Sequence, residues 1–287
     1  MRKSLKEVVM IEFNEQLTER DIINIPREQL YMFNIKNNSS VFPIPGLIYL
    51  KKDSKFLTVL FNGAVNREKT DYLTFQRWSW VENIGTNVLI LPDSTLNMGN
   101  FPLGWGVGNP SEWPIKSMVE TINNFIEKIN LSEKNTLLYG SSAGGFQAFL
   151  CGLLMEEVSV VMENPQTNVF EYYRKHVDVL LGKCYPNMKE KDIMNNFGER
   201  FSLMSAIEKY DKLPFFIYIQ NINDKFHHSN HYLPFISKLN KLKNKEKNNS
   251  FMTSAINLIE IEGEETHDPR GLDQLINIIK GIFGTDY

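Results

Sequence analysis

Short apolar runs alternate along the chain with stretches in which apolar residues recur every three or four positions. Each run is rich in Val, Ile, Leu and Phe and stops at a turn-forming or acidic residue. Such runs are typical of buried parallel strands, whereas the recurring pattern at residues 115–129 and 272–283 predicts helices. Strands that alternate with helices predict an α/β fold on a doubly wound, mainly parallel sheet. We expect its strands at residues 56–61, 87–91, 136–139, 158–162, 213–220 and 257–263.

Residues 1–50 differ from this pattern because they are β-rich and have no helical stretch. Apolar runs at residues 8–13, 31–35 and 47–50 are separated by turns that contain Asn and Pro. This element is either the antiparallel start of the main sheet or a small appended sheet. We expect residues 51–287 to form the main domain, in which residues 168–210 are a candidate cap over the site.

One predicted strand-to-helix junction carries a chemical motif. Ser142 lies midway between Gly140 and Gly144, after an apolar strand and before an apolar helix. A serine on so sharp a turn has a strained backbone, and side chains two residues away collide unless they are hydrogen atoms. We therefore interpret Ser142 as a nucleophile on a nucleophile elbow; the alternative is an ordinary strand, turn and helix.

An acid and a base follow at the ends of later strands. Asp224 comes after the strand at 213–220, and His267 comes after the strand at 257–263. The order Ser, Asp, His is the chain order of the catalytic triad in the α/β-hydrolase fold, which we therefore predict. In this hypothesis His267 takes the serine proton and passes it to a leaving group, while Asp224 fixes the imidazole. The alternative for His267 is a loop histidine without a catalytic role.

Four other carboxylates compete for the role of the acid. Asp93 follows too early a strand, and Asp268 adjoins His267 in the sequence, which makes a hydrogen bond to its ring awkward. The remaining rivals are Glu163 and Asp211.

Three further histidines follow Asp224 closely and raise the question of a metal. His227, His228 and His231 have no second cluster of ligands beside them. We expect no metal, and interpret the three as surface residues or as neighbours of the site.

Backbone N–H groups near Ser142 are candidates for an oxyanion hole. The first N–H groups of the predicted helix, beginning with Ala143, point toward the serine and carry partial positive charge. Gly63 and Ala64 follow the strand at 56–61, where this fold places the second donor. An ordinary turn after that strand is an equally good reading.

A long Gly-, Pro- and Trp-rich segment at residues 95–114 has neither helical nor strand period. It leaves the carboxyl end of a predicted strand, where ligands bind in parallel sheets. Trp105 and Trp113 are candidates to stack on a sugar ring or to hold an acyl chain. The alternative, which we favour, is that they fix the loop to the protein body.

Composition narrows the classes of function. The 287 residues carry a formal net charge of -3, which argues against a nucleic-acid-binding protein. Two cysteines, Cys151 and Cys184, provide no disulfide framework and fit a reducing cytoplasm. The charged N-terminus is not followed by an apolar segment, so we expect neither a secretory signal nor a membrane span.

Several motifs together resemble bacterial capsule-polysaccharide O-acetyltransferases of the serine α/β-hydrolase type. They are Leu138-Tyr-Gly-Ser-Ser-Ala-Gly-Gly145, Glu163-Asn-Pro-Gln166, Asn223-Asp224 with His227, and His267-Asp268. More distantly, the chain is similar to accessory-secretion acetyltransferases that modify adhesin glycans. The resemblance covers residues 55–285, and its most particular element is the Asn-Pro-Gln segment. It implies an acetyl-CoA donor, no bound cofactor and a sugar hydroxyl as acceptor.

These observations predict a cytoplasmic enzyme that forms an acyl-Ser142 intermediate and passes the acyl group to a glycan. Asn164 and Gln166, with the two tryptophans, are the candidates for contact with the substrate. A carboxylesterase with the same triad is the second hypothesis. The third is a non-catalytic module of a polysaccharide or secretion assembly. Acceptor, acyl length and homo-oligomerisation stay open.

Overall fold

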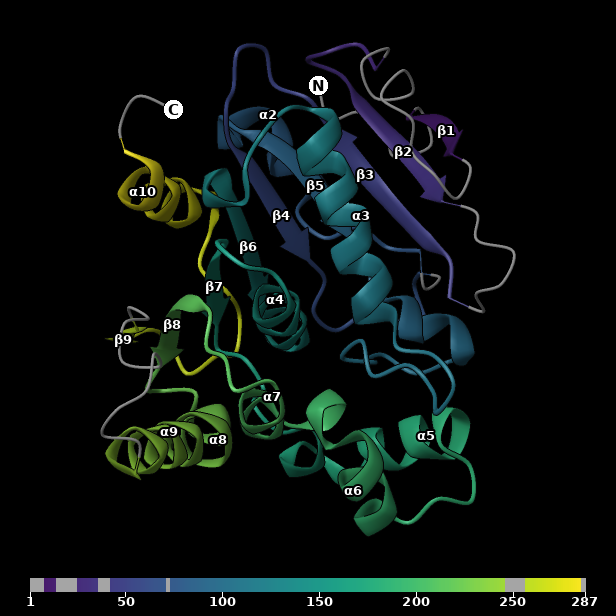
Figure 1. The fold of residues 1–287 in the computed structure, drawn as a ribbon, viewed down its shortest axis with the longest axis vertical. Helices are drawn as coiled ribbons and strands as arrows, with labels where there is room; N and C mark the ends of the chain where they lie inside the picture. The colour runs from purple at the N-terminus through teal and green to yellow at the C-terminus, as the bar shows by residue number, and fades with distance from the viewer. Residues whose placement is uncertain (1–7, 14–24, 36–41, 71–72, 246–255, 285–287) are drawn as a thin grey trace.

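The computed structural model describes residues 8–13, 25–35, 42–70, 73–245 and 256–284. The N-terminal residues 1–7, on which the expectation of no secretory signal rests, lie outside this part. A nine-stranded sheet runs through the molecule in the order β1-β2-β3-β5-β4-β6-β7-β8-β9 (Figure 1). Its strands are β1 (Val9–Phe13), β2 (Leu30–Ile35), β3 (Ile44–Tyr49), β4 (Leu57–Phe61), β5 (Asn87–Leu91), β6 (Thr136–Ser141), β7 (Ser159–Glu163), β8 (Phe215–Asn221) and β9 (Ile256–Ile261).

Six neighbouring strands of the sheet pair in parallel, in the order β5, β4, β6, β7, β8 and β9. Their carboxyl ends therefore meet at one edge of the sheet. Strand β3 pairs antiparallel with both β5 and β2, and β1 is parallel to β2. The first three strands thus extend the main sheet, and the predicted mainly parallel sheet is confirmed.

Helices cover both faces of the sheet. One face packs against α3 (Pro114–Lys128), α4 (Ala143–Leu154) and α9 (Leu233–Lys245), which contribute Phe125, Phe149 and Phe235 to its core. The other packs against α2 (Val81–Ile84) and α10 (Leu272–Phe283), which contribute Ile84, Leu275 and Ile279. Burial on both faces explains why the central strands are continuous apolar runs without alternation.

The segment between β7 and β8 forms α5 (Arg174–Cys184), α6 (Glu190–Phe201) and α7 (Leu203–Tyr210), which lie below α4 in Figure 1. These helices contact the Trp-rich loop that follows β5. The Tyr185 hydroxyl donates to the Val107 carbonyl at 2.9 Å, and Arg200 Nη1 donates to the Asn109 carbonyl at 2.6 Å. The two segments therefore form one body beside the sheet.

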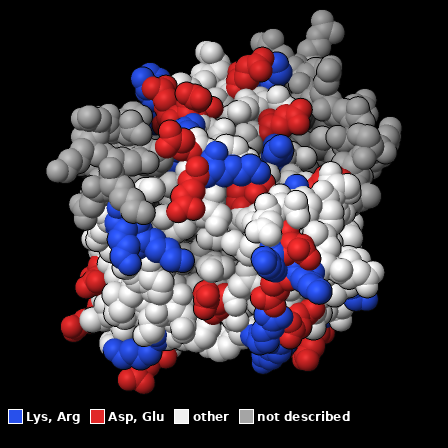
Figure 2. Space-filling model, turned by 60° about the horizontal axis from the view of Figure 1, so that its bottom comes forward, with Lys and Arg blue, Asp and Glu red and all other residues white. Residues whose placement is uncertain are grey.

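Surface charge agrees with the composition. On the face shown in Figure 2, acidic and basic side chains are interspersed, and no large area of one sign forms. Across the described ranges, no helix has the length and hydropathy to cross a membrane.

Two glycines make the turn between β6 and α4 sterically feasible. A Cβ atom at Gly140 would lie 2.2 Å from the Gly144 backbone, and one at Gly144 would lie 2.6 Å from the Phe61 carbonyl oxygen. Between them, Ser142 has a φ of 55°, in a region that residues with a side chain seldom adopt. The backbone at Ser142 is therefore held by close packing on both sides.

Gly140→Ala should lower the free energy of unfolding by about 2 kcal/mol or more, because its new methyl group meets rigid backbone. Gly182→Ala in α5 is the matched control, since a Cβ atom there has nothing within 4 Å. It should be neutral or stabilise by up to about 1 kcal/mol, because alanine is the better helix former. Urea unfolding measures both variants, and equal midpoints would contradict the steric role.

Candidate active site

Three candidate residues meet at the carboxyl edge of the sheet. Ser142 follows β6, Asp224 follows β8, and His267 follows β9. The parallel pairing of these strands with β7 between them brings residues 125 positions apart in the sequence to one site. Because β7 lies between β6 and β8, Ser142 lies on one side of the end of β7 and Asp224 lies on the other.

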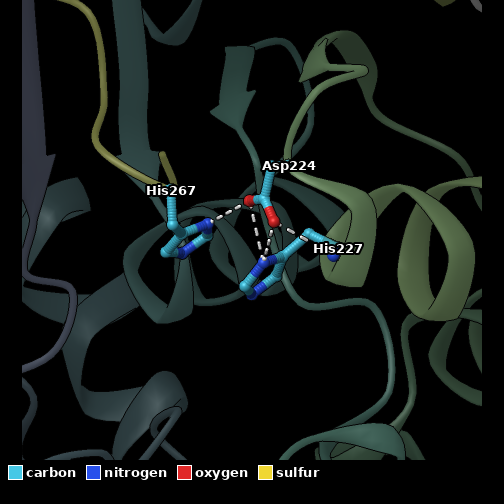
Figure 3. A group of neighbouring side chains, drawn as sticks. All are labelled: Asp224, His227 and His267. Carbon is cyan, nitrogen blue, oxygen red and sulfur yellow. Dashed lines mark hydrogen bonds and ion pairs between the residues drawn. The ribbon is translucent and has the colours of Figure 1, made fainter. Parts of the chain in front are cut away.

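The Asp224 carboxylate binds the His267 imidazole directly. His267 Nδ1 lies 2.6 Å from Asp224 Oδ2 (Figure 3). Burial opposes ionisation of Asp224, but hydrogen bonds and charge interactions with His227 and His267 outweigh it, so the pKa of this carboxyl lies well below its usual range. Asp224 is therefore ionised at neutral pH and fixes His267 with Nδ1 protonated and Nε2 free to accept.

Two residues at strand ends, Asn221 and Glu163, hold the loop that carries His267. The Asn221 side-chain amide donates to the carbonyls of Glu264 and Thr266, and Glu163 accepts from the backbone and side-chain nitrogens of Arg270. Glu163, a rival for the catalytic acid, thus lies behind the loop, where Tyr139 also donates to it at 2.8 Å. Its role is to anchor the loop.

A second imidazole, which the sequence reading gave no role, shares Asp224. His227 Nδ1 lies 3.0 Å from Asp224 Oδ1, and its ring stacks on His267 with centroids 3.6 Å apart (Figure 3). Burial lowers the pKa of His227, and the Asp224 hydrogen bond only partly opposes this. His227 and His231 are buried. For these two the surface interpretation is wrong, because each packs inward from the segment after Asp224, and His227 fits the alternative of a neighbour of the site.

Ser142 Oγ hydrogen-bonds to Gln166 in this structure. Gln166 Nε2 lies 2.9 Å from Ser142 Oγ and 2.7 Å from His227 Nε2, while Trp105 Nε1 donates to Gln166 Oε1 at 3.0 Å. His267 Nε2 is buried and has no hydrogen-bond partner among the residues described. The candidate base therefore has an unpaired acceptor nitrogen.

Ser142 and His267 line one pocket of about 390 Å³. Its other walls come from the loop after β4, from Gln76, Arg77 and Trp80, and from residues 268–271. Arg77 donates to Ser141 Oγ at 2.6 Å and lies over the rings of Trp80 and Tyr139. Gln76, Arg77 and Trp80 were not predicted as site residues from the sequence, although with Trp78 they form an aromatic and polar cluster before β5.

The candidate N–H donors differ in their availability. The Gly63 N–H donates to Gln76 Oε1 at 2.8 Å, and Gln76 Nε2 donates back to the Ala64 carbonyl. Ala143 is the first residue of α4, so its N–H has no partner within the helix. Gly63 still lies close to the nucleophile, since a Cβ atom there would be 3.7 Å from Ser142 Cβ. These positions leave Ala143 and Ala64 as the freer donors.

The remaining substrate-binding candidates lie inside the protein. Trp105 and Trp113 are both buried, and neither lines the pocket at Ser142. Trp105 holds Gln166, and Trp113 lies under the Arg200 guanidinium at 5.6 Å. This burial favours the alternative that they fix the loop. Asn164 is also buried, and its Oδ1 accepts from the Asn221 backbone at 2.7 Å, which ties β7 to β8.

Asp93, another rival acid, organises the Trp-rich loop. Its carboxylate accepts from the backbone nitrogens of Thr95 and Gly106. Burial raises the pKa of Asp93 to about 6, against the lowering effect of these hydrogen bonds. It fixes the loop that in turn positions Trp105.

Asp224, His227 and His267 each place one potential ligand atom within 4.8 Å of the others, so this group could hold a metal ion. The Nδ1 atoms of both histidines instead point at the carboxylate as hydrogen-bond donors. The same three side chains therefore fit a charge-stabilising arrangement.

No protein-family model and no curated protein matches the sequence. Among solved structures, the chain is similar to the capsule O-acetyltransferase of Neisseria meningitidis serogroup A, with 16% identity over 87% of this chain and 97% of that chain and a TM-score of 0.59. A histidine-to-alanine variant of that enzyme in complex with CoA aligns at 15% identity over 88% and 94% of the chains, with a TM-score of 0.60.

Two other structures extend the comparison. The glycosylation-associated protein complex Gap123 of Streptococcus agalactiae aligns at 13% identity over 86% of this chain and 46% of that chain, with a TM-score of 0.58. FphF, a fluorophosphonate-binding serine hydrolase of Staphylococcus aureus, aligns at 12% identity over 90% and 98%, with a TM-score of 0.57. These similarities show that the chain has the α/β-hydrolase fold, as predicted.

His231 provides a test of the buried histidines. Burial, reinforced by the nearby His227 and His267, lowers the pKa of His231 to about 3. Below pH 6.5 the unfolded chain protonates this residue while the folded chain does not, so the free energy of unfolding falls as the pH falls toward 3.

His231→Asn removes this titration and keeps an acceptor for the Thr167 N–H, which bonds to His231 Nδ1. The variant should be less stable at pH 7, but its deficit should shrink by about 2 kcal/mol at pH 5. Urea unfolding at both pH values measures this. If the free energy of unfolding fell equally from pH 7 to pH 5 in the wild type and in His231→Asn, the lowered pKa of His231 would be contradicted.

Proposed function

We propose that this protein is a serine acyltransferase that forms an acyl-Ser142 intermediate and transfers an acetyl group to a glycan hydroxyl. The observation that carries the proposal is the Asp224–His267 hydrogen bond together with a pocket that His267 and Ser142 both line. An ionised carboxylate, an imidazole with a free acceptor nitrogen and a serine on a strained turn are the parts that acyl transfer needs.

In this mechanism His267 Nε2 removes the proton of Ser142 as Oγ attacks the acyl carbon. The Oγ–C bond forms, the bond to the donor's leaving group breaks, and His267 passes the proton to that group. The N–H groups of Ala143 and Ala64 stabilise the oxyanion, while Gly63, whose N–H is bonded to Gln76, supports the loop. In the second half, His267 activates the acceptor hydroxyl and then returns the proton to Ser142.

Acetyl-CoA is the donor we propose, since a structural neighbour with this fold was solved with CoA. The glycan acceptor follows the capsule and glycosylation neighbours. Two free, buried cysteines fit a reducing compartment, so we place the reaction in the cytoplasm. We also propose that the body formed by α5 to α7 serves as the cap expected at residues 168–210.

A carboxylesterase is the second candidate, because FphF and other neighbours are serine hydrolases or esterases. The two functions share the first half-reaction and differ only in whether water or a sugar removes the acyl group. A non-catalytic module, the third hypothesis, requires that Ser142 be unreactive.

Incubation with acetyl-CoA should add one acetyl group to the wild-type protein and none to Ser142→Ala. Intact-mass spectrometry followed by peptide mapping checks this. Candidate glycans should then remove the acetyl group faster than buffer does. Equal decay in both favours the esterase, whereas a Ser142→Ala protein that still transfers acetyl groups would contradict both enzymes. Failure of a fluorophosphonate probe to label Ser142 would support the non-catalytic module.

The pocket wall offers a second test. Trp80 is partly exposed there and can stack on a sugar ring. Trp80→Ala should raise the KM for the acceptor about tenfold, a loss of about 1.4 kcal/mol of binding, and should leave acetylation of Ser142 by acetyl-CoA unchanged. Trp113→Phe is the control, because its indole is buried outside the pocket. An unchanged acceptor KM in Trp80→Ala would remove this residue from the acceptor site.

A further inference from the structure

Asp224 has two imidazole partners, and only one belongs to the proposed triad. His227 lies three residues after Asp224, is 3% exposed, and reaches the same carboxylate through Nδ1 (Figure 3). Its ring lies nearly parallel to that of His267, with 12° between the planes. The two rings therefore form a stacked pair that one buried charge holds.

The far side of His227 contacts Gln166. Since His227 Nδ1–H donates to the carboxylate, the neutral ring must accept at Nε2, and the Gln166 amide N–H is the donor 2.7 Å away. At the other end of the amide, the Trp105 indole N–H donates to Gln166 Oε1. The two contacts fix which end of the amide is nitrogen and which is oxygen.

This orientation leaves one N–H of Gln166, and it points at the nucleophile. Gln166 Nε2 lies 2.9 Å from Ser142 Oγ, and the amide is fully buried. The Ser142 hydroxyl can also donate to Gln166 Oε1, at the longer distance of 3.3 Å, but it loses that proton when Oγ becomes negative. The carboxylate of Asp224 is thus connected to Ser142 by hydrogen bonds through His227 and Gln166. Its bond to His267 ends there, because His267 Nε2 has no partner among the described residues.

We propose that Gln166 is a catalytic residue that stabilises negative charge on Ser142 Oγ, and that His227 is the positioning residue that aims it. The inference rests on the proposed acyl-Ser142 chemistry. During acylation Oγ loses its proton to His267 as the Oγ–C bond forms. During deacylation the acceptor O–C bond forms, the Oγ–C bond breaks, and His267 returns the proton to Oγ.

In both steps Oγ carries partial negative charge at the moment when its proton and its bond to carbon are exchanged. A fixed N–H donor in a buried site stabilises that charge without reorganisation. A glutamine with a free amide could rotate and present its oxygen to Ser142 instead, which would repel the developing charge. The contacts of His227 and Trp105 prevent that rotation.

Two substitutions at position 227 test separately the acceptor at Nε2 and the donor at Nδ1. His227→Gln places an amide oxygen near the Nε2 position and can still accept from Gln166. His227→Asn places an amide nitrogen near the Nδ1 position and keeps only the donor to Asp224. If His227 acts through Gln166, His227→Gln should stay within about threefold of the wild type. His227→Asn and Gln166→Leu should each be slower by about 10- to 100-fold.

The readouts are the rate of Ser142 labelling by a fluorophosphonate and the hydrolysis of p-nitrophenyl acetate, neither of which needs a glycan. The loss should fall on kcat and leave KM unchanged, because Gln166 acts on the reacting oxygen. His227→Asn should cost nothing further in the Gln166→Leu background. His228→Asn and His228→Gln are the matched controls, since the His228 ring stacks on Tyr232 and its bond to Asp224 comes from the backbone N–H, which both substitutions keep.

The inference is overturned if Gln166→Leu labels at the wild-type rate, if His227→Gln is as slow as His227→Asn, or if the losses are additive. Cooperative thermal unfolding shows which variants are folded. If His227→Asn does not fold, the rate of Gln166→Leu alone tests the inference. Wild-type protein that is labelled but never acetylates a glycan counts against the proposed transfer only. Wild-type protein that is not labelled counts against the acyl-enzyme and the inference together.

Discussion

The buried charge of Asp224 is the interaction on which the site depends. A carboxylate removed from water is costly unless hydrogen bonds satisfy it, and here two imidazole N–H groups do so. Each imidazole is thereby fixed in one tautomer, with its Nε2 turned away from the carboxylate. The same bonds that stabilise the charge therefore determine which nitrogen atoms are free to accept a proton or a hydrogen bond.

The sheet supplies the geometry that this charge requires. Parallel strands bring Asp224, Ser142 and the loop of His267 to one edge, but a loop needs its own restraints. Glu163 binds Arg270 and Asn221 holds Glu264 and Thr266, so polar residues at the ends of β7 and β8 fix the loop after β9. The Asn-Pro-Gln segment after β7 joins these supports to the nucleophile.

Much of the fold could be predicted from the sequence because each central strand is buried on both faces. Such strands read as uninterrupted apolar runs, and the predicted strands at 87–91 and 56–61 agree with β5 and β4 to within one residue. The place of residues 1–50 could not be predicted, since short β-rich runs do not reveal their partners. The pairing of β3 with β5 shows that these strands belong to the main sheet.

The site was predictable only where chain order carries information. Ser142, Asp224 and His267 follow strand ends in sequence, and the structure brings Asp224 and His267 into contact. The part played by His227 had no such signal, because a histidine three residues after an aspartate is equally compatible with a solvent-exposed helix. Trp80 and Arg77 reach the pocket through a left-handed turn at Arg77, where φ is 64°. No local pattern of residues predicts that turn.

In the proposed mechanism the choice between transfer and hydrolysis lies outside the triad, since both reactions use the same base and nucleophile. It depends on whether a sugar hydroxyl or a water molecule occupies the pocket beside His267 Nε2 in the acyl-enzyme. The wall formed by Trp80, Arg77 and residues 268–271 is partly open and carries a ring and a cation. An acceptor that stacks there places its hydroxyl by binding energy, whereas water has no such anchor. Under this proposal the residues around Ser142 provide reactivity, and the residues of this wall select the acceptor of the acyl group.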